Sequence, residues 1–201
     1  MNYLFNKNHL RIVYYHMIAE SPPEYYSTNG SISKQSFSRQ LQYFMKNFNI
    51  ISIDEATHKI NNKEKFNNNL IITFDDGFSS IYHNAIPILN DYNIPSCVYL
   101  ISDCVLKKKM MWRNILFYIQ NNYENDLIGN ISAAISAEHE INKKTEGQSL
   151  LKWSMLSWPM GKREILTNIF LDELSIDINQ YINHYKPYMQ KKELIKILNS
   201  G

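Results

Sequence analysis

One short segment in the first half of the chain constrains its fold more than any other. Leu70 to Phe74 is a run of apolar and β-branched residues, which is typical of a buried β-strand. Asp75, Asp76 and Gly77 follow directly, and an Asp-Gly pair commonly ends a strand. Neighbouring side chains of a strand point to opposite faces. Two adjacent acids can therefore share one site only where the strand breaks into a turn, which glycine permits because it lacks a Cβ.

Two interpretations of this segment are open at this point. In an α/β barrel the catalytic side chains lie at the carboxyl ends of the strands, so the acids would belong to an active site. Alternatively, the strand ends in an ordinary turn and both carboxylates are solvated. For an isolated Asp-Asp-Gly sequence, the ordinary turn is the commoner outcome.

The residues around the acids favour the catalytic interpretation. Markers of a helix, a tight turn and a further strand follow in order: Pro87 and Leu89, Tyr92 to Pro95, and Val98 to Ile101. Together with Thr73 to Gly77 they resemble the first motif of the polysaccharide deacetylase family, also called the NodB-homology or carbohydrate esterase family four domain. The resemblance implies an α/β fold of the (β/α) barrel type, and it covers the first half of the chain better than the second.

The upstream segment also fits this family. Leu10 to His16 reads as a strand, and many members open with a strand that ends in Tyr-His. Apolar residues from Phe37 to Met45 recur at helical spacing, and Asn49 to Glu55 is similar to the family's second strand. The polar segment 21–33 is predicted to be a loop, and an ordinary surface loop is favoured over one that contacts substrate.

Helical patterns dominate the second half of the chain. From Trp112 to Ile182, apolar residues recur at helical spacing, with a break at Pro159 to Gly161. We expect residues 105–186 to form a helical insertion in the C-terminal half of an incomplete (β/α) barrel of the NodB type. Residues 1–104 are then the N-terminal part of the barrel with the Thr-Phe-Asp-Asp-Gly motif. Residues 187–201 resemble the helix that precedes the family's second motif.

The resemblance implies a different role for each acid. Asp75 is the expected general base, and Asp76 is the expected ligand of a divalent metal, zinc or a similar ion. In such chemistry the cation polarises the N-acetyl carbonyl and lowers the pKa of its bound water, while a carboxylate takes the proton from that water. One carboxylate cannot be both ligand and free base, which explains the pair. His16, Thr73 and Gly77 are candidate neighbours of this site.

The sequence lacks the family's other metal ligands. These are two histidines in a His-Ser/Thr-x-x-His motif, whereas no two of the six histidines here are four residues apart. The later motifs, which supply an Arg that orients the base and a His that acts as general acid, are absent as well. Because catalytic zinc sites usually have three protein ligands, we expect Asp76 alone to hold no metal tightly. The chain is then the front portion of a deacetylase, truncated before its histidine pair and inactive alone.

Composition argues against several other classes of protein. The net charge of +2 comes from 21 basic and 19 acidic residues, and no basic stripe of the kind that binds nucleic acid is evident. No apolar run approaches the length of a membrane span and the N-terminus has no leader pattern, so we expect a cytoplasmic protein. Cys97 and Cys104 are too few for a disulfide framework and are expected to be thiols.

Three functions remain open from the sequence. The first is a metal-dependent de-N-acetylase that acts on an N-acetylated carbohydrate. The second is a non-catalytic remnant or a carbohydrate-binding module. The third is one half of a complementing pair, in which a separate chain supplies the rest of the barrel, because an unpaired strand edge invites such pairing.

Overall fold

The computed structural model describes residues 9–27, 29–106 and 108–199, and the chain divides into two units. The sheet unit contains the described residues of Met1–Ser21, Gly30–Lys107 and Lys186–Gly201. The helical unit contains those of Pro22–Asn29 and Lys108–Tyr185. The predicted domain boundaries at residues 104 and 186 stay a prediction.

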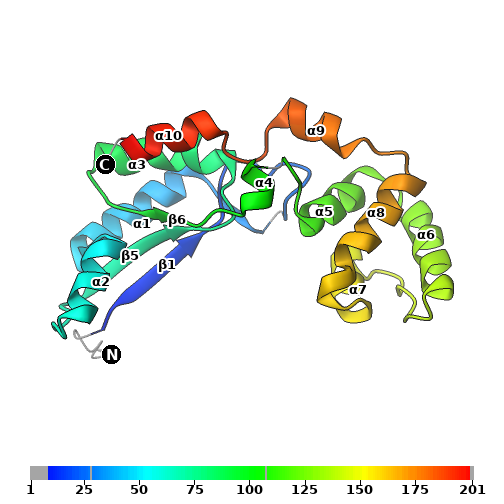
Figure 1. The fold of residues 1–201 in the computed structure, drawn as a ribbon, viewed down its shortest axis with the longest axis horizontal. Helices are drawn as coiled ribbons and strands as arrows, with labels where there is room; N and C mark the ends of the chain where they lie inside the picture. The colour runs from blue at the N-terminus through cyan, green and yellow to red at the C-terminus, as the bar shows by residue number, and fades with distance from the viewer. Residues whose placement is uncertain (1–8, 28, 107, 200–201) are drawn as a thin grey trace. The chain divides into compact units, whose positions relative to one another are not determined.

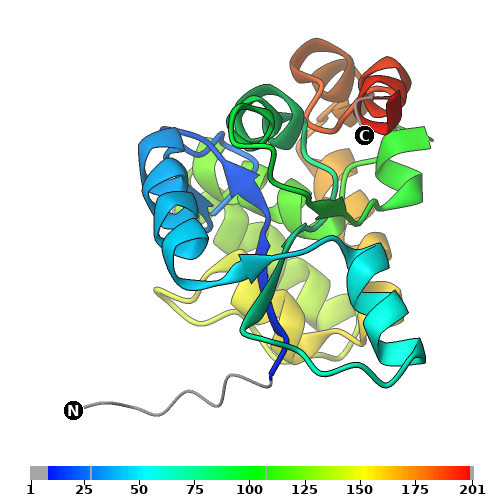
Figure 2. The same ribbon diagram turned by 90° about the vertical axis from the view of Figure 1, so that its left-hand side faces the viewer.

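Strand β5 (Asn69–Phe74) is the centre of the sheet unit, and all six of its residues are buried. On one edge it pairs in parallel with β1 (Arg11–Tyr15), from Arg11 opposite Leu70 to Tyr15 opposite Phe74. On the other edge it pairs in parallel with β4 (Asn49–Ile50) and, farther along, with β6 (Cys97–Val98) (Figures 1 and 2). A parallel strand that is covered on both faces needs the continuous apolar sequence seen here.

Two helices cover the opposite faces of β5. Helix α1 (Lys34–Asn47) places the buried Phe37 ring 5.8 Å from the ring of Phe74. Helix α2 (Ile53–Asn61) contributes the buried Ala56, which forms a core cluster with Ile71. Ile71 and Phe74 point to opposite faces of the strand because side chains alternate along it. The burial of β5 therefore depends on both helices.

The remaining elements of the sheet unit are short. Strands β2 and β3 form a separate parallel pair, and a π-helical turn runs directly into α3. Their bounds are β2 (Met17–Ile18), β3 (Ser31–Ile32), the π-helical turn (Ile81–Ala85), α3 (Ile86–Asp91), α4 (Ser102–Leu106) and α10 (Lys191–Asn199). Glu193 stabilises the start of α10, because its Oε2 accepts a 2.8 Å hydrogen bond from the backbone N–H of Gln190.

The helical unit packs its own core. Its helices are α5 (Trp112–Asn122), α6 (Asn125–Glu138), α7 (Leu150–Ser157), a 3₁₀ turn (Met160–Lys162), α8 (Arg163–Glu173) and α9 (Ile178–Tyr185) (Figure 1). Trp153 and Phe170 are fully buried and meet edge to face, with ring centroids 6.4 Å apart. A buried hydrogen bond holds the segment around Tyr25 against α5: Asn114 Nδ2 donates to the carbonyl of Tyr25 at 2.8 Å.

The structure confirms a parallel α/β fold and the helical character of the second half of the chain. The described strands form one sheet of four strands and one of two, and neither closes into a barrel within the described residues. No disulfide joins the two described cysteines. Within the described residues, no helix combines the length and the apolar character that crossing a bilayer requires.

Two predicted strands are wrong in their extent. The strand expected over residues 49–55 ends at Ile50, because Ser52 caps α2 by accepting the N–H of Glu55 on its Oγ at 3.0 Å. The strand expected through Ile101 ends at Val98. Tyr99 and Leu100 are 50% and 42% exposed, so the apolar run continues beyond the sheet as surface.

Shortening a side chain in β5 is expected to destabilise the protein strongly. Ile72 is 0% exposed, and Ile72→Ala should lower the free energy of unfolding by about 2–5 kcal/mol. Ile12 on the edge strand β1 is 59% exposed, so Ile12→Ala is the matched control and should cost less than about 1 kcal/mol. Urea unfolding measures both; similar losses for the two variants would contradict a sheet centred on β5.

Candidate active site

The turn after β5 breaks from extended backbone at two successive residues. Asp76 has φ +70° and Gly77 has φ +73°, so both lie in the left-handed region. Aspartate is one of the few residues with a side chain that adopt this region with any frequency. A Cβ on Gly77 would meet Leu100 Cδ2 at 2.7 Å. That methyl group ends a flexible, partly exposed side chain, so glycine is favoured at position 77 by its backbone conformation rather than by lack of space. The left-handed backbone begins one residue earlier, at Asp76.

A distant segment of the chain holds this turn in place. Phe78 forms an isolated antiparallel bridge with Tyr188. Two backbone hydrogen bonds flank the bridge: Ser79 N–H donates to Pro187 O at 2.8 Å, and Met189 N–H donates to Gly77 O at 2.9 Å. The rings of Phe78 and Tyr188 are buried and stack with centroids 5.2 Å apart and planes 17° apart. These contacts fix the backbone directly after the two acids.

His16 lies against Asp76. Its Nδ1 is 3.1 Å from Asp76 Oδ2, and the two side chains are 37% and 22% exposed. A carboxylate can only accept, so the hydrogen bond requires a proton on Nδ1. His16 follows β1, and the carboxyl ends of β1 and β5 lie side by side because these strands are parallel and in register. The ring of Tyr14 meets the imidazole edge to face at 5.7 Å.

Asp75 lies on the other side of the turn, toward β6. Its backbone N–H donates to Tyr15 O at 2.8 Å, which continues the β1 ladder. Tyr99 N–H donates to Phe74 O at 2.7 Å, which brings Tyr99 next to the first acid. The pKa of Tyr99 is raised, first by the charge of the Cys97 thiolate and also by the Asp75 carboxylate. The site therefore contains Asp75, Asp76, His16 and Tyr99.

Thr73 and Gly77, the other two predicted neighbours of the site, have structural rather than chemical roles. Thr73 is 3% exposed, and its Oγ1 donates to Val13 O at 3.2 Å, which ties β5 to β1. Gly77 gives the turn its shape. Neither residue contributes a functional group to the candidate site.

Sequence reasoning missed Tyr99 as a member of this site. A signal for it was present, because parallel strands end at the same edge of a sheet and Tyr99 directly follows the strand that pairs with the end of β5. The predicted strand through Ile101 concealed this position, since it placed Tyr99 inside the sheet.

The donor set does not complete a metal site. Asp76 and His16 supply one carboxylate and one imidazole, and both groups are ligands that zinc accepts. Nowhere in residues 9–27, 29–106 and 108–199 do three His, Cys, Asp or Glu side chains come together in a way that could hold an ion. Two ligands fall short of the three that a catalytic zinc usually takes from the protein. No step of the chemistry is therefore assigned to a metal on these residues alone.

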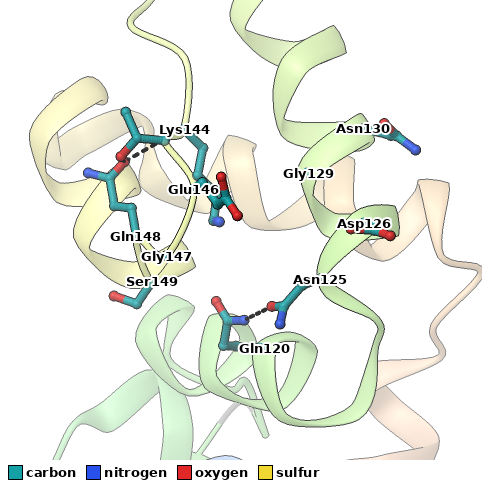
Figure 3. A pocket seen from close by; sticks show the side chains of 11 residues that line it. Gln120, Asn125, Asp126, Gly129, Asn130, Lys144, Glu146, Gly147, Gln148 and Ser149 are labelled. Atoms are coloured by element: carbon teal, nitrogen blue, oxygen red, sulfur yellow. Dashed lines mark hydrogen bonds between the residues drawn. The ribbon is translucent and has the colours of Figure 1, made fainter.

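A separate polar hollow of about 900 Å³ lies within the helical unit (Figure 3). Three of its carboxamides, those of Gln120, Asn125 and Gln148, form hydrogen bonds within the protein. Gln120 Nε2 donates to Asn125 Oδ1 at 2.9 Å, and Gln148 Oε1 accepts the N–H of Thr145 at 3.1 Å. The hollow contains neither acid of the motif and no histidine or cysteine, so it is not the candidate active site.

Several solved structures resemble parts of this fold, and two of the three that follow are described as deacetylases. IcaB from Ammonifex degensii is 24% identical with a TM-score of 0.44, and the match covers 56% of this chain and 48% of that one. BC0361, a polysaccharide deacetylase from Bacillus cereus, is 21% identical with a TM-score of 0.42, over 55% and 35% of the two chains. The Streptococcus pyogenes deacetylase PplD is 17% identical with a TM-score of 0.44, over 74% and 80%. The chain thus spans less than half of the first two of these structures.

The family model gives the direct assignment. No curated protein matches the sequence. The model described as polysaccharide deacetylase matches residues 62–164, which is slightly more than half of the chain and includes β5 and both acids. The chain therefore belongs to the polysaccharide deacetylase family.

Proposed function

We propose that this chain carries the base and one metal ligand of a metal-dependent polysaccharide de-N-acetylase site. The observation that carries the proposal is the turn after β5, which presents Asp75 and Asp76 together with His16 at 3.1 Å from Asp76. Family membership supports the reaction class, which is hydrolysis of an N-acetyl amide on an amino sugar. The proposed substrate is an N-acetylated polysaccharide.

The contacts of the two acids support different roles for them. Asp76 already accepts a hydrogen bond from His16, whereas no described side chain donates one to the carboxylate of Asp75. Asp75 is therefore the acid that is available to take a proton, and we assign it as general base. In the reaction a water oxygen bonds to the acetyl carbon as Asp75 removes its proton, and the C–N bond then breaks to give acetate and a sugar amine.

The leaving amine needs a proton, and His16 is the described group best placed to supply one. Its imidazole lies beside the two acids, and the hydrogen bond to Asp76 orients the ring. Asp76 then has two tasks, since it orients His16 and is the proposed metal ligand. The chain's own histidines do not supply the family's second motif, so the ligand set must be completed by residues other than those described here.

Zinc is expected to leave the stability of this chain unchanged. A tenfold excess of Zn²⁺ should shift the thermal unfolding midpoint by less than about 1 °C, because two ligands bind the ion too weakly for the linkage effect to appear. Differential scanning calorimetry of the wild type and of Asp76→Ala measures this shift. A stoichiometric increase in midpoint that disappears in Asp76→Ala would show that the chain holds a complete site.

The protein with a complete set of metal ligands is expected to release acetate from N-acetylated oligosaccharides. Asp75→Asn should lower kcat by a factor of about 10² to 10⁴, because the variant cannot accept the proton from water. The exposed Asp91 on α3 provides the matched control, and Asp91→Asn should leave kcat unchanged. Equal activity of Asp75→Asn and the wild type, measured by acetate release, would remove Asp75 from the role of base.

A further inference from the structure

A second hollow in the helical unit combines closely packed, tilted tyrosine rings with acidic side chains. It has a volume of about 610 Å³, within the size range of small-molecule sites. We call it the tyrosine hollow; the residues that matter most are Glu24, Tyr118, Asp177, Tyr181, His184 and Tyr185. All of them belong to the helical unit: Glu24 lies between β2 and β3, Tyr118 lies on α5, Asp177 directly precedes α9, and the other three lie on α9.

Three tyrosine rings form a continuous aromatic surface in this hollow. The ring centroids of Tyr118 and Tyr181 are 4.6 Å apart, and those of Tyr181 and Tyr185 are 4.4 Å apart. Tyr25 is buried behind this row and meets Tyr181 edge to face at 6.1 Å. Tyr185 remains 58% exposed, so the row ends in a ring that a ligand can reach. The negative faces of such rings attract cations.

Two carboxylates give the tyrosine hollow a negative potential. Glu24 lies close to the phenols: burial is the largest cause of the raised pKa of Tyr181, and the negative charge of Glu24 raises it further. Asp177 uses Oδ1 to accept the N–H groups of Asn179 and Gln180 at 3.0 Å, which caps α9, and these bonds leave Oδ2 unused. No lysine or arginine lines the hollow. Neither Glu24 nor Asp177 forms an ion pair within the part of the chain that the structure describes.

The backbone that carries Glu24 is held rigidly. Asn121 Nδ2 donates to Glu24 O at 2.7 Å, and Asn114 Nδ2 donates to Tyr25 O at 2.8 Å. Both asparagines lie on α5, as Tyr118 does. The acid and the first ring of the aromatic row are therefore positioned by the same helix, which reduces the ordering that a ligand would have to impose.

We propose that the tyrosine hollow binds glycan units that carry a free, protonated amino group. An ammonium group is attracted by the ring faces and by both carboxylates, whereas an N-acetyl group is neutral and gains neither attraction. Asn122, Gln180 and Ser175 line the same hollow and offer hydrogen bonds to sugar hydroxyls. The inference rests on the proposed function for the identity of the glycan, because de-N-acetylation is the reaction that creates such amines. The helical unit is then a binding site for the deacetylated polymer, separate from the acids that perform the chemistry.

Calorimetric titration of the full chain tests this proposal. The ligands are a glucosamine hexasaccharide and the N-acetylglucosamine hexasaccharide, each at 50 mM and 300 mM salt. The glucosamine oligomer should bind at least tenfold more tightly than its N-acetylated counterpart. Its affinity should fall at the higher salt, because exposed charges are screened.

Two variants of the hollow, each with a matched control, locate the binding. Tyr185→Ala should weaken binding of the glucosamine oligomer roughly two- to fivefold, as expected for loss of one exposed ring. Tyr43→Ala removes a tyrosine of the sheet unit that is also 58% exposed, and it should have no effect. The double variant Glu24→Gln, Asp177→Asn should weaken binding at least tenfold while keeping the α9 cap, since asparagine also caps helices. Glu138→Gln, Glu173→Gln removes two exposed acids of the same unit and should leave binding unchanged.

Several outcomes would overturn the inference. These are absence of binding, equal affinity for both oligomers, or full affinity in the Tyr185→Ala and Glu24→Gln, Asp177→Asn variants. Binding that is lost in Asp75→Asn but kept in the hollow variants would place the amine at the catalytic acids instead, and it would leave the proposed function intact. Conversely, binding at the hollow in a protein that never releases acetate would support the hollow while the proposed function fails.

Discussion

The parallel pairing of β5 along both of its edges is the constraint on which the candidate site depends. Strand β1 contributes five successive pairs on one edge, and the short strands β4 and β6 complete the other. In-register pairing with β1 brings His16 to Asp76, and pairing with β6 brings Tyr99 to Asp75. Each side chain of the site therefore comes from the carboxyl end of a strand, at the edge where α/β folds place their chemistry. Without this register the acids would lie on an ordinary turn.

The sequence was sufficient for features that depend on local chemistry. The apolar run of β5 and the Asp-Gly break after it are encoded by adjacent residues, and both were predicted. The contact of His16 with Asp76 joins residues 60 positions apart, so it follows from strand register rather than from either residue's neighbours. The left-handed conformation of Asp76 was also missed, because Gly77 offered a sufficient explanation for the turn. A serine cap at Ser52 outweighed the β-branched residues around it and replaced part of a predicted strand by a helix.

The two units carry different sets of functional side chains. The sheet unit holds the acids and the histidine of the candidate active site, on a backbone fixed by hydrogen bonds from two neighbouring strands. The helical unit holds a row of tyrosines and a pair of carboxylates on helices that pack their own core. If the proposed function holds, this division lets one polymer chain contact the two sites through different sugar units.

The bridge between Phe78 and Tyr188 has a consequence for how the protein is made. The two residues are about 110 positions apart in the sequence. The bridge that holds the acid turn can therefore form only after the helical segment between them has been synthesised. Closing so long a loop also carries an entropic cost that local contacts do not. Strand β5 can pair with β1 and β4 during synthesis, whereas the turn that carries the acids is completed only when the segment around Tyr188 follows. A nascent chain therefore forms the pairing of β5 with its earlier neighbours before the contact that fixes its candidate active site.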